Sequence, residues 1–114
     1  MTNEYEAVVA QIVRQSGVVG AMLVDIEDGL AIAGADTLGA GWEPAAALAS
    51  SVFRRTREAS ADAGLGNAKF VRLEADRGHV CATASGDIVL VAVTGRNINL
   101  GKLRLEMLNA AEQI

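Results

Sequence analysis

The first hydrophobic residues of the chain repeat with the period of an α-helix. One helical stripe is formed by Tyr5, Val8, Val9, Ile12 and Val13. Asn3, three residues before Glu6, suits a helix N-cap, and Gly17 suits the left-handed residue after a last turn. This spacing predicts an amphipathic helix over residues 4–15.

Two apolar runs follow, over residues 18–25 and 30–33, with Asp28-Gly29 between them. Near-continuous apolar runs are typical of strands covered on both faces, and an Asp-Gly pair suits a chain reversal. We therefore expect a β-hairpin. Turn and loop roles, rather than metal binding, are also expected for the acidic residues Asp25, Glu27, Asp28 and Asp36.

A Gly-rich loop over residues 34–43 leads to a long helix from about Pro44 to Ala63. Short turns then separate three strand-like runs, at residues 69–75, 79–84 and 88–94, which predict an antiparallel meander. A last helix begins near Asn99, a suitable N-cap. The predicted order is α-β-β-α-β-β-β-α in an α+β fold, and 114 residues suffice for one domain over residues 1–114.

The second helix has more apolar surface than one sheet requires. One face holds Ala45, Leu48, Val52, Thr56, Ala59 and Ala63. The adjoining face holds Ala46, Ala49, Phe53 and Ser60. Together they span roughly 160°, against about 100° for a helix on one sheet. We expect a second copy of the chain to cover the surplus, with Phe53 as its anchor and Ala46, Ala49 and Ser60 allowing close approach. The alternative is a sheet that curves around the helix.

The strand over residues 69–75 supports the same dimer. Val71 and Leu73 alternate with Arg72 and Glu74, a pattern typical of a strand near a sheet edge. An unpaired edge attracts another chain, so Val71 and Leu73 join the predicted dimer interface. The opposite side of the second helix is expected to be exposed to solvent; it holds Ser51, Arg54, Arg55, Glu58 and Asp62.

Charge and composition exclude several classes of protein. The net charge is −4 and the only basic cluster is Arg54, Arg55 and Arg57, which argues against a nucleic-acid partner. The single cysteine cannot form an internal disulfide, and neither a signal peptide nor a membrane-spanning run of about 18 apolar residues is evident. We expect a cytoplasmic protein without membrane insertion.

Candidate catalytic groups are few. His79 and Cys81 share one strand face, but side chains two residues apart stand about 7 Å apart, so we expect a buried cysteine rather than a dyad. One histidine and one cysteine are too few for a structural zinc site, which takes about four ligands. The sequence thus predicts no catalytic residue, no metal and no cofactor.

The segment between Gly95 and Gly101 differs from a phosphate-binding loop, because it has five intervening residues and Leu103 follows Lys102. We expect an ordinary helix cap there, the alternative being an anion site between Arg96 and Lys102. Trp42, the only tryptophan, is a candidate partner contact or a lid on the domain's own core.

Two segments of the sequence, together with the order of elements, resemble those of a known family. The hairpin over residues 24–33 and the segment Asn99-Leu100-Gly101-Lys102-Leu103-Arg104-Leu105-Glu106 make the chain resemble the Roadblock (dynein light chain) family, particularly its small bacterial members. The resemblance implies a five-stranded antiparallel sheet with the second helix on one face and the other two helices on the opposite face. It also implies homodimers joined through the second helix and third strand, and binding to small Ras-like GTPases, whose hydrolysis some bacterial members raise.

The predicted function is therefore a non-catalytic homodimeric adaptor that binds a bacterial Ras-like small GTPase and modulates its nucleotide cycle. Candidate partner contacts are Trp42, Arg54, Arg55 and Arg57. A small-molecule sensor domain and a dimerisation scaffold without a GTPase partner are the alternatives.

Overall fold

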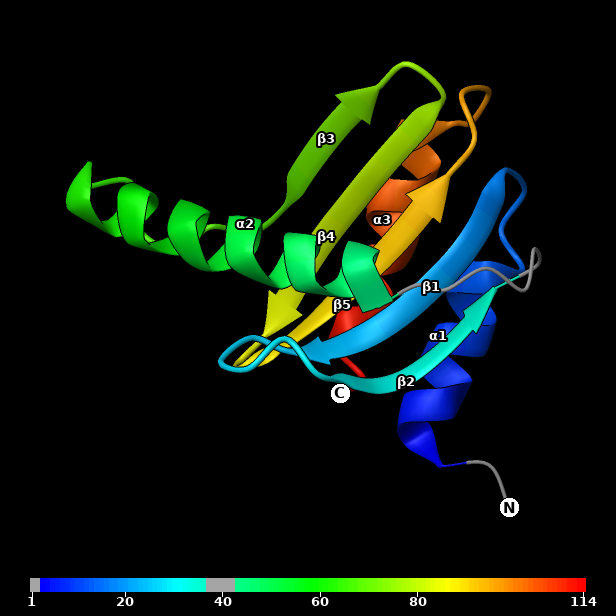
Figure 1. Cartoon of the computed structure of the whole chain (residues 1–114), viewed down its shortest axis with the longest axis horizontal. Helices are drawn as coiled ribbons and strands as arrows, with labels where there is room; N and C mark the ends of the chain where they lie inside the picture. Colours follow the sequence, from blue (N-terminus) through cyan, green and yellow to red (C-terminus); the bar gives the residue numbers. More distant parts are fainter. Residues whose placement is uncertain (1–2, 37–42) are drawn as a thin grey trace.

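The computed structural model of the chain describes residues 3–36 and 43–114, and the elements there follow the predicted order (Figure 1). Their bounds are α1 Glu4–Val13, β1 Val18–Asp25, β2 Ala31–Asp36, α2 Glu43–Asp62, β3 Val71–Ala75, β4 Gly78–Ser85, β5 Ile88–Thr94 and α3 Leu100–Ala111. The order α-β-β-α-β-β-β-α is thus confirmed.

Two strands begin later than predicted. The backbone N–H of Leu30 donates to Asp28 Oδ1 at 2.9 Å, so Leu30 still belongs to the turn and β2 begins at Ala31. The Thr83 hydroxyl donates to the Lys69 carbonyl at 2.7 Å, and β3 begins two residues after Lys69, at Val71. Side-chain hydrogen bonds of this kind compete with strand pairing at the ends of a ladder.

All five strands form one antiparallel sheet in the order β2-β1-β5-β4-β3. The β1–β2 hairpin and the β3–β4–β5 meander join through β1 and β5, where Leu23 pairs with Leu90 and Ala21 with Ala92. The edges of the sheet are therefore β2 and β3, far apart in space (Figure 1).

Helices cover the two faces of the sheet unequally: α2 lies on one face, and α1 and α3 lie on the other (Figure 1). Alternation along β5 explains both cores, because Leu90 and Ala92 point toward α1 and α3 while Val89 and Val91 point toward α2. This arrangement confirms the fold that the family resemblance implied. Across the described residues, no helix has the length and apolar character that a membrane crossing needs.

Local signals in the sequence account for the helix and turn boundaries. Asn3 Oδ1 accepts from the Glu6 N–H at 2.8 Å, and Asn99 Oδ1 accepts from the Lys102 N–H at 3.0 Å, so both predicted N-caps are confirmed. Gly17 after α1 has φ of 91°, the left-handed conformation that the sequence suggested.

The β1–β2 turn uses its acidic residues as the sequence predicted. Asp25 Oδ1 accepts from the Glu27 N–H at 2.8 Å, and Asp28 Oδ1 accepts from the Leu30 N–H. Gly29 takes the positive φ of 72° that this turn requires. Local turn chemistry therefore explains these carboxylates.

Gly78 lies where β4 starts and where two backbone segments approach closely. A Cβ at this position would collide with the Thr94 carbonyl oxygen of β5. Gly101 in α3 differs, because its nearest neighbour would be Asn99 Oδ1 at 3.6 Å, an ordinary contact.

We predict that Gly78→Ala lowers the unfolding free energy by about 2–4 kcal/mol, since the backbone must move apart to admit the methyl group. The matched change Gly101→Ala should raise it by about 0.5–1 kcal/mol, because alanine is the better helix former. Urea denaturation of both variants measures the difference. Equal stabilities would contradict the close approach.

Candidate dimer and partner surface

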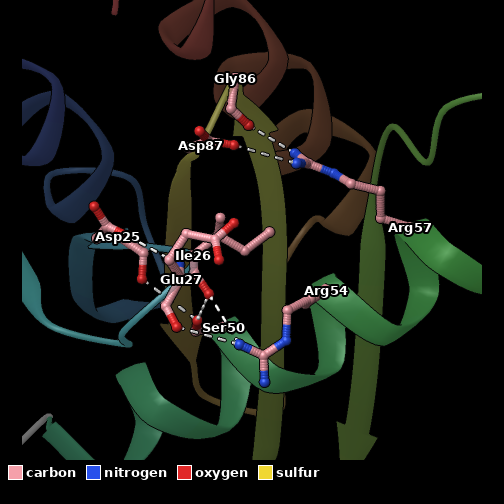
Figure 2. A network of polar contacts seen from close by, with 8 residues as sticks. All are labelled: Asp25, Ile26, Glu27, Ser50, Arg54, Arg57, Gly86 and Asp87. Carbon is pink, nitrogen blue, oxygen red and sulfur yellow. Dashed lines mark hydrogen bonds and ion pairs between the residues drawn. The ribbon is translucent and has the colours of Figure 1, made fainter.

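Polar side chains of α2 bind backbone carbonyls at one end of the sheet (Figure 2). The Ser50 hydroxyl donates to the Ile26 carbonyl at 3.0 Å, and Arg54 Nη1 donates to the carbonyls of Ile26 and Glu27, each at 3.3 Å. These carbonyls lie just after β1, where the strand ladder has ended. These contacts hold α2, around Ser50 and Arg54, against the β1–β2 turn.

Arg57 makes the second set of contacts, one helical turn further along (Figure 2). Its Nη2 donates to the Gly86 carbonyl at 2.7 Å, and its Nη1 lies 3.7 Å from Asp87 Oδ1 in the β4–β5 turn. The guanidinium also stands over the Phe53 ring at 5.6 Å from its centroid. We call Ser50, Arg54 and Arg57 the α2 latch, because together they bind α2 to two turns.

The latch changes the interpretation of the arginine cluster. Arg54 and Arg57, predicted to face water or a partner, are half-buried and bind the chain's own backbone. Arg55 is the exposed member of the cluster. As a partner contact it remains a prediction.

The structure moves two predicted interface residues into the core. Phe53 is 0% exposed and Ala49 is 4% exposed, packed with Met22, Val24 and Val91 against the chain's own sheet. Both side chains are thus covered mainly by the chain's own sheet. The expectation of Phe53 as a dimer anchor is therefore corrected: the largest apolar side chain of α2 covers the sheet because burial there removes most of its surface from water.

The surplus apolar flank of α2 lies instead at Leu48 and Val52. A narrow groove separates this flank from the sheet, with Leu48 and Val52 on one rim and Val71 and Leu73 on the other. Its floor is apolar and is formed by Ala49, Phe53, Val80 and Ala82. Leu48 is 48% exposed and Leu73 is 36% exposed, so both rims are open.

The groove runs beside the free edge of the sheet. Among the residues that the structure describes, β3 pairs only with β4, and four of its five residues are exposed. Figure 1 shows α2 crossing in front of the sheet, with its C-terminal half projecting beyond β3. The predicted residues Val71 and Leu73 therefore lie together with an unpaired strand edge and an overhanging helix.

Other predicted residues fall elsewhere. The Ser60 hydroxyl donates to the Gly66 carbonyl at 2.7 Å and helps to end α2. Ala46 belongs to α2, but its side chain is not among those described, and Trp42 lies outside the described residues. The helical wheel placed Leu48 on one of two apolar faces of α2. A wheel cannot by itself show which of the two faces packs on the sheet, so it did not identify Leu48 as the exposed residue.

His79 and Cys81, the two residues considered for catalysis, are both buried in the fold. The His79 ring is 8% exposed, with Nδ1 at 3.3 Å from Thr94 Oγ1 and Nε2 at 3.9 Å from Glu74 Oε2. Cys81 is fully buried between the sheet and the helices α1 and α3. Burial raises the pKa of the Cys81 thiol, while nearby Arg72 acts weakly in the opposite direction. The fold thus disfavours the thiolate that a nucleophilic cysteine needs.

We expect Arg54→Ala to lower the unfolding free energy by about 1 kcal/mol, because two carbonyls lose a charged hydrogen-bond donor. Arg55→Ala, a matched change on the exposed side of the same helix turn, should leave stability almost unchanged. Urea denaturation compares the two variants. A loss as large for Arg55→Ala would show that the latch has no special role.

Cys81 should react with a thiol reagent only when the native fold opens. Because the folded pKa is raised, the stability that neutral Cys81 contributes is present below the pKa of the unfolded thiol and falls as the pH rises through the folded pKa. Labelling kinetics with and without denaturant, with Cys81→Ala as the blank, measure this protection. Immediate labelling of native protein would contradict it.

Comparison with known proteins places the chain in one family. The Roadblock/LC7 domain model matches residues 4–94. In Methanocaldococcus jannaschii, the uncharacterised protein MJ1340 is 30% identical over 96% of this chain and 95% of its own length. MJ0714 of the same organism is 31% identical, covering 96% of this chain and 92% of that protein.

Solved structures share the fold at lower identity. A Roadblock/LC7 domain from Streptomyces avermitilis superposes with a TM-score of 0.84 at 22% identity, covering 94% of this chain and 91% of that one. Myxococcus xanthus MglB superposes with a TM-score of 0.85 at 18% identity, covering 97% and 91%. The family match, the M. jannaschii relatives and the sheet order agree, and the chain belongs to the Roadblock/LC7 domain family.

Proposed function

We propose that two copies of this chain pair through α2 and β3, and that the dimer is a non-catalytic adaptor which binds a Ras-like small GTPase and modulates its nucleotide cycle. The observation that carries the proposal is the open apolar groove between α2 and the edge strand β3. Its rims and the unpaired strand edge are features that a second copy of the same chain can cover together.

The free energies of burial and of association indicate which contacts such a dimer needs. Leu48 and Leu73 of each copy are partly exposed, and covering four such leucines contributes about 1 kcal/mol each. Association costs about 4–15 kcal/mol before any net affinity appears. The leucines alone do not suffice, so the strand-edge hydrogen bonds and the projecting half of α2 must add to the dimer's stability.

Family membership supports the GTPase partner. Members of this family commonly bind small Ras-like GTPases, and the structural neighbours include MglB from Myxococcus xanthus and the gliding protein MglB from Thermus thermophilus. A further neighbour is described as MglB with a tetrameric arrangement, so copies of that protein assemble. Arg55, exposed on α2, is the arginine of the cluster most accessible to such a partner.

A non-catalytic role agrees with the placement of the reactive groups. Arg54 and Arg57 would have to leave their carbonyl partners before either could stabilise a transferring phosphoryl group. Cys81 is buried and its thiol is held protonated. Modulation of a GTPase by this chain would therefore act through the conformation of the partner rather than through a group inserted into its active site.

We expect a nucleotide-dependent complex when the chain is mixed with the GTPase encoded nearest to its gene. Size-exclusion chromatography with light scattering, on the GTPase loaded with GDP or a GTP analogue, should show a complex in one state only. Arg55→Ala should weaken it about tenfold, the effect of a typical interface hot spot. Lys102→Ala on α3, an exposed cation on the opposite face of the sheet, serves as the matched control.

The alternatives predict other results. A dimer that binds no GTPase in either nucleotide state would indicate a dimerisation scaffold. A large rise in melting temperature with one compound of a metabolite panel would indicate a sensor domain.

A further inference from the structure

β3 carries opposite charges on either side of its centre. The strand Val71–Ala75 has Leu73 in the middle, Arg72 before it and Glu74 after it. Because successive side chains alternate between faces, Arg72 and Glu74 share the face of Phe70, which packs in the α1 and α3 core. Val71 and Leu73 share the α2 face, where they line the groove.

Both charged side chains are available at the strand edge. Arg72 and Glu74 are exposed, and the Glu74 side chain remains 69% exposed although His79 Nε2 of β4 lies 3.9 Å from it. Arg72 pairs across the ladder with Cys81, which is fully buried and uncharged at its raised pKa. Among the described residues, the Glu74 carboxylate has His79 of β4 as its ion-pair partner, and no ion pair is seen for Arg72.

Geometry limits how a second copy can join this edge. In an antiparallel pair, residues directly opposite one another point to the same face. A two-fold axis perpendicular to the joined sheet therefore keeps both α2 helices on one side. With the axis at Leu73, Leu73 lies opposite its own copy, Arg72 lies opposite Glu74, and Val71 lies opposite Ala75.

Neighbouring registers that keep the helices together are less favourable. An axis at Arg72 would place the two Arg72 side chains opposite one another. An axis at Glu74 would place the two Glu74 carboxylates opposite one another, and Arg72 would then face Asp76, which lies in the turn beyond the strand. Like charges directly opposite destabilise a strand pair. Either shift would also leave part of the strand Val71–Ala75 without a strand residue opposite it.

We infer that, in the proposed dimer, the two β3 strands align about a two-fold axis at Leu73, and that two symmetric Arg72–Glu74 ion pairs select this register. The inference rests on the proposed dimer and adds to it the residues that specify the partner. Apolar contact in the groove provides attraction, while the charge pattern permits one alignment and opposes its neighbours.

Charge reversal tests the pairs. Arg72→Glu and Glu74→Arg should each raise the dimer dissociation constant about fivefold, because each places like charges opposite at two symmetric positions. The double variant Arg72→Glu/Glu74→Arg should recover an affinity near that of the original chain. A mixture of the two single variants should form heterodimers in preference to either homodimer.

The matched control is Arg14→Glu, which makes the same charge change at the end of α1, away from β3. It should leave the dissociation constant unchanged. Sedimentation at several concentrations measures all five proteins. Single reversals that dimerise as tightly as the original chain would overturn the ion pairs.

Cysteine crosslinking reads the register directly. In a Cys81→Ala background, Leu73→Cys should form an intermolecular disulfide, because opposite Cα atoms lie about 4.5–5.5 Å apart, within disulfide reach. Arg72→Cys and Glu74→Cys should not, since each then lies two positions from its copy, beyond the limit of about 7 Å.

The outcomes separate two failures. Crosslinking at position 72 or 74 instead of 73, or at none of the three in a chain that still dimerises, would overturn this register and leave the proposed dimer intact. A chain that sediments as a monomer at every concentration would overturn the dimer itself, and with it the proposed function.

Discussion

The packing of α2 on the sheet is the constraint on which the rest of this molecule depends. Phe53 is fully buried against Val24 and Val91, so the middle of the helix has one position on the sheet. From that position α2 runs outward past β3, and its C-terminal half has no sheet beneath it (Figure 1). The groove at Leu48 and Leu73 is a consequence of this crossing, because the helix diverges from the edge strand there.

Hydrogen bonds at one end of the sheet set the direction of the helix. The α2 latch binds carbonyls that follow β1 and β4, where backbone acceptors would otherwise meet only water (Figure 2). Phe53 alone would allow α2 to rotate over the sheet, but the latch fixes a second point along it. Any partner that binds the exposed side of α2 therefore meets a helix held at two places, which favours a preorganised surface.

The free edge has features that both protect it and make it selective. Charged residues on an edge strand discourage indiscriminate pairing, and Arg72 and Glu74 are such residues on β3. Charges of a single sign would only repel a second copy of the strand. Because Arg72 and Glu74 have opposite signs on either side of Leu73, they can instead attract the charges of an antiparallel copy. In the proposed dimer, the apolar rims of the groove supply attraction and the charges on β3 supply alignment.

Sequence patterns alone determined the order of elements, both N-caps, the β1–β2 turn and the apolar surplus of α2, because each depends on residues close together in the chain. Tertiary structure decided which apolar face of α2 the sheet would cover: Ala49 and Phe53 went inward and Leu48 stayed open. It also took Arg54 and Arg57 from the solvent into the latch. A helical wheel records angles around one axis, whereas these outcomes depend on where distant strands and turns place their side chains and carbonyls.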